Sequence, residues 1–424
     1  MRDLATVLGT TVACVDTHDG EAAAPRSFWR RARLMLTAVV LLAAGAATAV
    51  ALLPDAEAPP ADDAFYDAPD PLPAGPPGAI LRSEAIADPP PGASAYRILY
   101  RSRGHSGRAA ALSALLFVPS RPAPSDGRNV VALAHGTVGV ARRCAVSRGR
   151  AFFDDVDGLA RFVRAGYAVV VPDLEGLGTQ GAHPYLVGDA NARAMLDAVR
   201  AAQRLEAAQA SERFVAWGVG QGGHTALFTA QQAASYAPEL ELAGVAAAAP
   251  MANLGRLLDS VAGTPGGDVM AAYMLSTWSR VYPRLRLDEV VTAPARETVE
   301  QVSELCVAID HERIGPVLGE RDVRLAYRTT APWNSEPWKE LLARNSPGAK
   351  TITVPVIITQ GADDVFVWPA ATARFVRYLC GLGTTVQYRP SRGVAHSDVG
   401  EKTAPYVSRW IAGRFAGEPA RSTC

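Results

Sequence analysis

Short apolar runs alternate with amphipathic stretches along most of the chain from about residue 96 onward. Runs rich in β-branched residues predict strands, and apolar residues that recur every three or four positions predict helices. The expected strands are Ala111–Val118, Val130–Ala134, Tyr167–Pro172, Phe214–Gly218, Ala243–Ala248 and Val354–Thr359. The expected helices are Phe152–Ala165, Asp189–Leu205, Gly222–Ala234 and Ala370–Leu382.

This alternation predicts an α/β fold with a doubly wound, mostly parallel sheet. The apolar runs are continuous, which is typical of central parallel strands covered on both faces. A long segment from Met251 to Lys350 breaks the alternation, because it is helical or irregular and rich in Trp, Tyr and Leu. Since a strand resumes at Val354, we expect an inserted helical cap or lid at about 251–350, not a separate small domain.

The first 90 residues follow a different pattern. Leu34–Leu53 is uncharged and matches the roughly 20 residues that a helix needs to cross a hydrocarbon core. Four arginines lie just before it, so we expect the N-terminus to stay in the cytoplasm; they are Arg26, Arg30, Arg31 and Arg33. The segment is either a signal peptide cleaved near Ala56–Ala58 or an uncleaved anchor.

Both alternatives place the rest of the chain outside the cytoplasm, secreted or anchored to the outer face of the cytoplasmic membrane. The expected organisation is a cytoplasmic leader at 1–33 and a signal or anchor at 34–53. A Pro-, Ala- and Asp-rich linker with an extended segment follows at 54–90. The folded domain is expected at 91–424, and only residues 34–53, if uncleaved, are expected to contact the membrane.

Composition and cysteine spacing argue against nucleic-acid binding and metal binding. Lys+Arg and Asp+Glu are equal at 42 each, so no basic excess favours a nucleic-acid partner. Three of the five cysteines, Cys144, Cys306 and Cys380, lie in the exported body and leave room for one disulfide and a leftover thiol. No CxxC or clustered His/Cys spacing indicates a metal site.

The strand Phe214–Gly218 leads into a glycine-rich turn and then a helix. This is the layout of the nucleophile elbow G-x-S-x-G, in which a sharp turn lifts a serine above the sheet. Here the frame from Gly218 to Gly222 has Gly220 at its third position, with neither hydroxyl nor thiol. The turn lacks the Walker lysine and the dinucleotide-binding spacing of phosphate loops.

Two later residues support the elbow interpretation by their order. Asp364 follows the strand Val354–Thr359, and His396 follows another short strand. The order elbow, Asp, His is that of α/β-hydrolases, in which His takes the proton of the nucleophile and Asp orients the imidazole. This chemistry needs no cofactor.

A loop after an early strand carries the oxyanion donors that such a site also needs. His135–Gly139 follows the strand Val130–Ala134, and its backbone N–H groups, with that of Gln221, are candidate oxyanion donors. Three histidines fall outside the triad order and are expected to be structural; they are His135, His183 and His224.

Several motifs in register resemble the secretory lipase family, which includes fungal lipase A and actinobacterial exported lipases. The resemblance covers most of residues 65 to 410. The matching segments are Ala134–Thr137 with Cys144-Ala145, Pro172–Thr179, His183–Leu186, Leu196–Ala201, Trp217–His224, and the Asp364 and His396 loops.

The resemblance implies an α/β-hydrolase core with a helical lid and hydrolysis of carboxylic esters, often acylglycerols, so that a lipid or ester is the expected substrate. By motif position, Asp364 is the triad acid, His396 the base, and Thr137 and Gln221 the oxyanion donors. The same resemblance favours a disulfide between Cys144 and Cys306.

Gly220 departs from the family pattern, which has serine there. Loss of the nucleophile removes nearly all triad catalysis and leaves only the contribution of oxyanion and binding groups. Thr225 lies a turn into the helix and is not expected to replace it. Three alternatives remain: a lipase-type ester hydrolase that has lost its serine, a pseudoenzyme that binds lipids or acyl esters without turnover, and a hydrolase that uses a bound water or another nucleophile.

Overall fold

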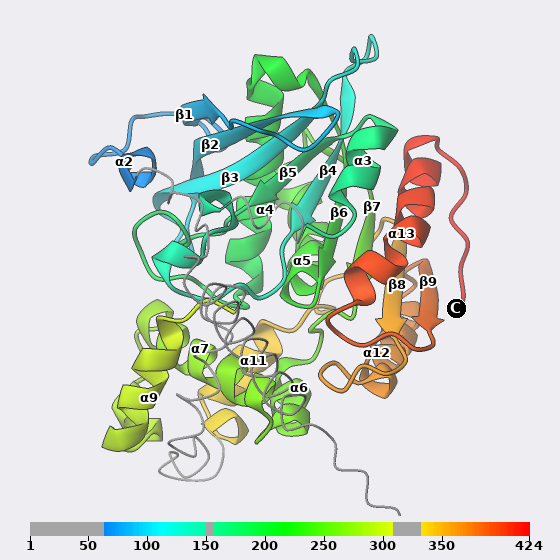
Figure 1. Cartoon of the computed structure of the whole chain (residues 1–424). Coiled ribbons are helices and arrows are strands. Elements are labelled where there is room, and N and C mark those ends of the chain that lie inside the picture. Colours follow the sequence, from blue (N-terminus) through cyan, green and yellow to red (C-terminus); the bar gives the residue numbers. More distant parts are fainter. Residues whose placement is uncertain (1–62, 150–155, 308–331) are drawn as a thin grey trace, which may run out of the picture. The chain divides into compact units, whose positions relative to one another are not determined.

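A mixed β-sheet forms the centre of the described part of the protein (Figure 1). The computed structural model describes residues 63–149, 156–307 and 332–424, all within the compact unit Pro59–Cys424. In these residues the sheet has nine strands in the order β1-β2-β3-β5-β4-β6-β7-β8-β9. The strands are β1 Ile80–Ala85, β2 Ala93–Arg103, β3 Ala109–Pro119, β4 Arg128–Ala134, β5 Ala168–Pro172, β6 Ala210–Val219, β7 Glu241–Ala248, β8 Val356–Gly361 and β9 Val386–Ser391.

The strands from β5 through β4 to β9 are parallel, which confirms the expected doubly wound, mostly parallel sheet. The expectation was wrong for Ala111–Val118, because β3 runs antiparallel to both β2 and β5. β3 is nevertheless buried along almost its whole length. Burial on both faces therefore makes the apolar run continuous, whatever the direction of the strand.

Alternate residues of the central strands face two helical layers. In β4, Val130 packs in the cluster that contains α4, α5 and α12, whereas Val131 packs in the cluster that contains α3 and α13. This follows from the side-chain period of two along a strand. The elements of these layers are α3 Leu159–Ala165, α4 Gly188–Arg204, α5 Gln221–Tyr236, α12 Pro369–Gly381 and α13 Val399–Phe415, and the short 3-10 turns are η1 Arg142–Cys144, η2 Val146–Arg148 and η4 Glu206–Ala208.

The expected helices correspond to α4, α5 and α12, with ends that agree within about two residues. The first expected helix, Phe152–Ala165, overlaps α3, and its residues 152–155 lie outside the described residues.

The residues that precede the sheet pack onto it. α2 Asp63–Tyr66 carries Tyr66, which is fully buried and hydrogen-bonded to the Ser147 hydroxyl at 2.8 Å. The structure thus differs from the expected linker at 54–90, since from residue 63 onward this segment contributes α2 and the edge strand β1. Four of the six residues of β1 are exposed, so its sequence has no apolar run that would predict a strand.

Helices fill the described part of the insertion between β7 and β8, and Figure 1 shows them gathered below the sheet. Residues 308–331 of this insertion lie outside the described residues. The side-chain oxygen of Asn345 accepts the Gly188 N–H at 3.2 Å, and its carbonyl accepts His224 Nε2–H at 2.7 Å. The end of the insertion is thereby tied to α4 and α5. Its elements are α6 Leu254–Val261, α7 Pro265–Val281, α8 Leu287–Val290, α9 Ala293–Ser303, η6 Pro332–Asn334 and α11 Trp338–Arg344.

Two disulfides join distant parts of the described chain, Cys144 to Cys306 and Cys380 to Cys424. The expectation of one disulfide and a leftover thiol was therefore wrong. The C-terminal tail runs back to β9, where the Thr423 N–H donates to the Val386 carbonyl at 2.8 Å. This return brings the last residue beside α12, a contact that no local pattern predicts.

In the part of the chain that the structure describes, no helix is both long and apolar enough to cross a membrane. The expected signal or anchor at 34–53 lies outside that part.

Candidate active site

The turn between β6 and α5 has the backbone of a nucleophile elbow with glycine at its tip. Gly220 lies at φ 55° and ψ −111°, a conformation that is strained for any residue with a side chain. A Cβ on Gly218 would lie 2.3 Å from the carbonyl carbon of Gly222, and one on Gly222 would lie 2.0 Å from the Ala134 carbonyl oxygen. The strand and the helix therefore approach so closely that both flanking positions require glycine.

We expect Gly222→Ala to destabilise the fold by about 3 kcal/mol or more, because a backbone oxygen cannot yield as a flexible side chain can. Gly255→Ala in α6 is the matched control, since its Cβ would meet nothing within 4 Å. The control is expected to retain or slightly gain stability. Urea unfolding of both variants tests this, and equal stabilities would contradict the tight approach at the elbow.

Asp364 lies buried on the loop after β8 and is held by several donors. Its Oδ1 accepts the N–H groups of Phe366 at 2.9 Å and Val367 at 2.8 Å. Its Oδ2 accepts Gln360 Nε2–H at 3.1 Å and lies 2.8 Å from His396 Nδ1. The carboxylate is thus fixed in the position from which it can orient the imidazole.

His396 lies between Asp364 and the elbow. Because a carboxylate only accepts hydrogen bonds, Nδ1–H donates to Asp364 and the lone pair of the neutral ring is at Nε2. A Cβ on Gly220 would lie 3.3 Å from that Nε2 and 3.6 Å from Met251 Cε. Gly220, His396 and Asp364 therefore have the arrangement of a Ser-His-Asp triad in which the first side chain is absent.

The two predicted oxyanion residues, Thr137 and Gln221, line the same pocket. Thr137 lies on the loop His135–Gly139 after β4, which we call the candidate oxyanion loop. Gln221 is the first residue of α5, so its N–H has no acceptor within the helix. The hydroxyl of Thr137 is hydrogen-bonded to Tyr185 OH at 3.0 Å. The amide nitrogen of the Gln221 side chain lies 3.5 Å from His183 Nε2, which turns that side chain toward His183.

The three histidines expected to be structural each contact backbone carbonyls. His183 Nδ1–H donates to the Glu175 carbonyl at 2.8 Å, and burial lowers its pKa to about 3. His224 donates to the Asn345 carbonyl, and burial lowers its pKa to about 4. His135 Nδ1 contacts the Gly136 carbonyl at 2.7 Å, although this histidine also lines the pocket. His183 and His224 are thus neutral near pH 7, which suits structural donors.

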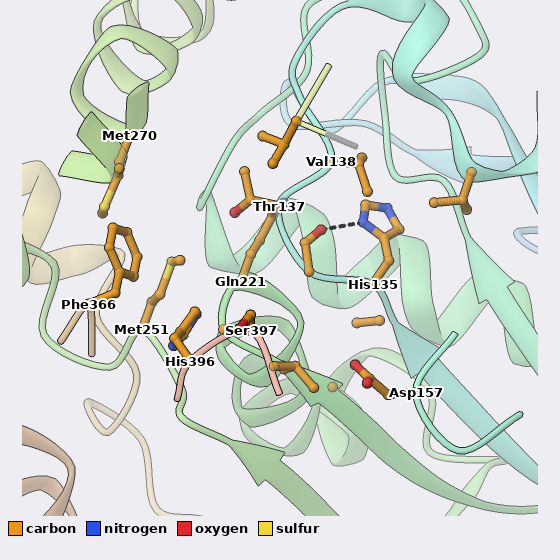
Figure 2. Close-up of a pocket in the computed structure, with 18 of the residues that line it drawn as sticks. His135, Thr137, Val138, Asp157, Gln221, Met251, Met270, Phe366, His396 and Ser397 are labelled. Carbon is orange, nitrogen blue, oxygen red and sulfur yellow. Dashed lines mark hydrogen bonds between the residues drawn. The ribbon is translucent and has the colours of Figure 1, made fainter. Parts of the chain in front are cut away.

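A pocket of about 770 Å³ opens above Gly220 at the carboxyl ends of the parallel strands. Most of its wall is apolar, and its polar residues include His135, Thr137, Asp157, Gln221, His396, Ser397 and Glu401. Figure 2 shows Met270, Phe366 and Met251 on one side of the pocket and His135 and Val138 on the other. Such a shape and composition are typical of a site for an apolar ligand with a small polar end.

The insertion contributes directly to this wall through Val269, Met270 and Val307. The Val307 N–H donates to the Val138 carbonyl at 2.9 Å, next to an isolated bridge between Gly139 and Cys306. With the Cys144–Cys306 disulfide, these bonds fix the middle of the insertion, at Cys306 and Val307, to the candidate oxyanion loop.

Two of the residues that support the site were not predicted from the sequence. Gln360 donates to the Asp364 carboxylate, and its own side-chain oxygen accepts the Thr372 hydroxyl at 2.6 Å. Tyr185 bonds Thr137 and accepts Trp278 Nε1–H of the insertion at its carbonyl at 2.8 Å. Tyr185 belongs to a segment that resembles the family, but nothing in its spacing indicated a partner 48 positions away.

The sequence relatives of this chain are lipases by name. A protein of Mycobacterium tuberculosis named a probable inactive lipase is 24% identical over 387 residues, covering 85% of this chain and 83% of the relative. Lipase 6 of Candida albicans is 24% identical over 402 residues, covering 86% of this chain and 84% of the relative.

Solved structures show the same fold at low identity. Candida antarctica lipase A in its closed state has a TM-score of 0.72 at 20% identity, covering 86% of this chain and 88% of that chain. A rice cell wall degrading esterase from Xanthomonas oryzae has a TM-score of 0.63 at 20% identity, covering 80% of this chain and 98% of that chain. The model of the family described as secretory lipase matches residues 154–423. The chain therefore belongs to the secretory lipase family, with an α/β-hydrolase fold.

Proposed function

We propose that this protein binds apolar acyl compounds in its lipase pocket and does not hydrolyse them through a serine nucleophile. The observation that carries the proposal is the elbow itself. The nearest atom to a Cβ on Gly220 would be His396 Nε2 at 3.3 Å, yet the position holds no hydroxyl. The base and acid have the spacing of a triad, so only the attacking atom is missing.

The roles of the surrounding residues are part of this proposal. Gly220 occupies the nucleophile position, Asp364 orients His396, and the N–H of Gln221 with the Thr137 loop receives the acyl oxygen. In an active enzyme with such a site, these donors stabilise the charge that develops on the carbonyl oxygen. Here they would orient a bound carbonyl group without a covalent step.

Neighbouring hydroxyls are poorly placed to replace serine. Thr225 Oγ1 donates to the Gln221 carbonyl at 3.1 Å, back along the helix, and is fully buried. Ser397 lines the pocket beside His396, but its hydroxyl donates to Asp398 Oδ1 at 3.1 Å. The name of the mycobacterial relative, a probable inactive lipase, agrees with a loss of turnover.

A second candidate function is slow ester hydrolysis by a water molecule. The observation that favours it is the pairing of His396 with Asp364 at 2.8 Å, with Nε2 facing the space where the serine hydroxyl would be. General-base activation of a water contributes about 10²- to 10⁴-fold, far less than a complete triad supplies.

We expect the natural chain to bind a non-hydrolysable fluorescent acyl ether saturably while showing little hydrolysis of p-nitrophenyl esters. His396→Ala separates the two candidates. Under the binding proposal, it leaves the residual hydrolysis unchanged. If the natural chain hydrolyses esters measurably and His396→Ala abolishes this, the water-based function is favoured, and if no ligand binds, the binding proposal fails.

We further propose that the protein acts outside the cytoplasm, as the description of its family as secretory supports. Whether Leu34–Leu53 is cleaved or retained as an anchor determines whether the protein is released. N-terminal sequencing of the mature protein distinguishes cleavage after Ala58 from retention of the leader. The insertion at about 251–350 would then act as the lid of an exported domain.

A further inference from the structure

His396 has one ring nitrogen without a protein partner in the described part of the chain. Nδ1–H is used by Asp364 at 2.8 Å, which leaves the Nε2 lone pair directed at the elbow. The nearest atoms to a Cβ at Gly220 would be Nε2 at 3.3 Å and Met251 Cε at 3.6 Å, so no side chain fills the position of a serine oxygen. A ligand that donates a hydrogen bond from that position would satisfy Nε2.

We propose that the pocket is specific for free carboxylic acids with an apolar chain, the acid hydroxyl taking the place of the absent serine oxygen. This inference rests on the proposed function, because it names the ligand that the unreactive pocket binds. The acid O–H donates to His396 Nε2, and the carbonyl oxygen accepts the N–H of Gln221. One carboxyl group thus uses both polar parts of the site.

An ester can use the Gln221 N–H but not His396 Nε2. Its alkoxy oxygen has no hydrogen to donate, so its lone pairs would face the lone pair of Nε2. A site that hydrogen-bonds a hydroxyl discriminates strongly against an analogue without it, because its polar groups are left unpaired. One lost hydrogen bond of this kind corresponds to about a ten- to hundredfold loss of affinity.

The charges of the wall favour an acid that binds in its protonated form over one that binds as a carboxylate anion. The residues that line the pocket include the carboxylates Asp157 and Glu401 but no lysine or arginine. The described lining therefore contains no fixed cation that would bind a carboxylate anion. The hydrogen bond from the acid O–H to His396 Nε2, on a ring oriented by Asp364, is the interaction left to bind the head group.

The chain of the ligand is expected to be apolar and of substantial length. Met251, Val269, Met270 and Phe366 line the pocket beyond the elbow. Each CH₂ group buried against such a wall should strengthen binding about fourfold, so affinity should rise steadily from short to long saturated acids.

Gly220→Ala tests the proposal with the smallest possible change. Its methyl group would occupy the space assigned to the acid oxygen, 3.3 Å from Nε2, without adding a hydroxyl. Gly383→Ala is the matched control, because Gly383 has a similarly positive φ of 82° but a Cβ there would meet nothing within 4 Å. Both variants place a side chain on a residue with positive φ, which strains the backbone, but only Gly220→Ala narrows the pocket.

The experiment measures binding of palmitic acid and methyl palmitate to the full-length protein by displacement of a fluorescent acyl ether. We expect the natural chain and Gly383→Ala to prefer the acid at least tenfold. Gly220→Ala should lose at least tenfold in affinity for the acid and little for the ester. Thermal unfolding establishes that each variant is folded, and if Gly220→Ala is not, His396→Phe provides the same comparison.

The failures of the two proposals are distinguishable. Equal binding of acid and ester by the natural chain, or an unchanged acid preference in Gly220→Ala, overturns the specificity for acids but leaves acyl binding intact. Binding of neither compound, and no displaceable acyl ether, overturns the proposed function itself.

Discussion

Gly220→Ser is expected to raise the kcat/KM for p-nitrophenyl ester hydrolysis by about three orders of magnitude or more. The backbone is already in the elbow conformation, at φ 55° and ψ −111°. The new Cβ would approach a ring nitrogen at 3.3 Å and a flexible methionine end at 3.6 Å, with no backbone atom among its nearest neighbours. The hydroxyl would therefore extend toward His396, which is already bonded to Asp364.

The restored serine also has a cost, since a side chain in this backbone conformation is strained by about 1–3 kcal/mol. Gly220→Ala is the control, because it has the same strain and no hydroxyl. It should lose stability like the serine variant and gain no activity. Adding Asp364→Asn to Gly220→Ser should remove nearly all of the recovered rate, because the imidazole then adopts the wrong tautomer. If the serine variant is folded but as inactive as the alanine variant, the assignment of the triad is wrong.

The sequence predicted the elements whose own residues carry a clear hydrophobic pattern. The central strands are continuous apolar runs and α4 has a clear helical repeat, so β4, β5 and α4 were expected close to their observed bounds, whereas β6 begins four residues before the expected strand. β1 and β2 lie at the antiparallel edge, where exposed positions interrupt the apolar pattern. α13 was also missed, and Pro405 within it is typical of a helix end, not of an interior.

The candidate site was predictable for a different reason. In this fold, the order of elbow, acid and base along the chain is sufficient to nominate Gly220, Asp364 and His396, without knowledge of distances. The supporting contacts depend on packing between distant segments. Gln360 and Tyr185 are ordinary residues in sequence, and only the fold places them against Asp364 and Thr137.

The pairing of the cysteines also depends on contacts between distant segments. A pairing between Cys380 and Cys424 depends on the return of the C-terminal tail to β9, which is a tertiary contact. Cys144 and Cys306 are 162 positions apart, and it was family resemblance that linked them, not their spacing.

Removal of the Cys144–Cys306 disulfide is expected to destabilise the protein by at most about 5 kcal/mol and to weaken acyl binding. In the chain-entropy model, a cross-link across 162 positions restricts the unfolded chain by about that amount, and residual structure in the unfolded state reduces it. Binding is affected because the Val307 N–H bonds the Val138 carbonyl beside the cross-link, and both valines line the pocket. The variant is Cys144→Ala with Cys306→Ala, which leaves no buried hydroxyl.

The second disulfide provides the matched control. Cys380 and Cys424 are 44 positions apart, so their removal should cost a comparable amount, at most about 4 kcal/mol. Neither cysteine lines the pocket, and binding of the fluorescent acyl ether should not change. Urea unfolding and ligand titration of the two double variants separate general stability from the local effect. If both variants lose affinity equally, the weaker binding reflects lost stability alone, and the tether between the insertion and the candidate oxyanion loop has no separate role in shaping the pocket.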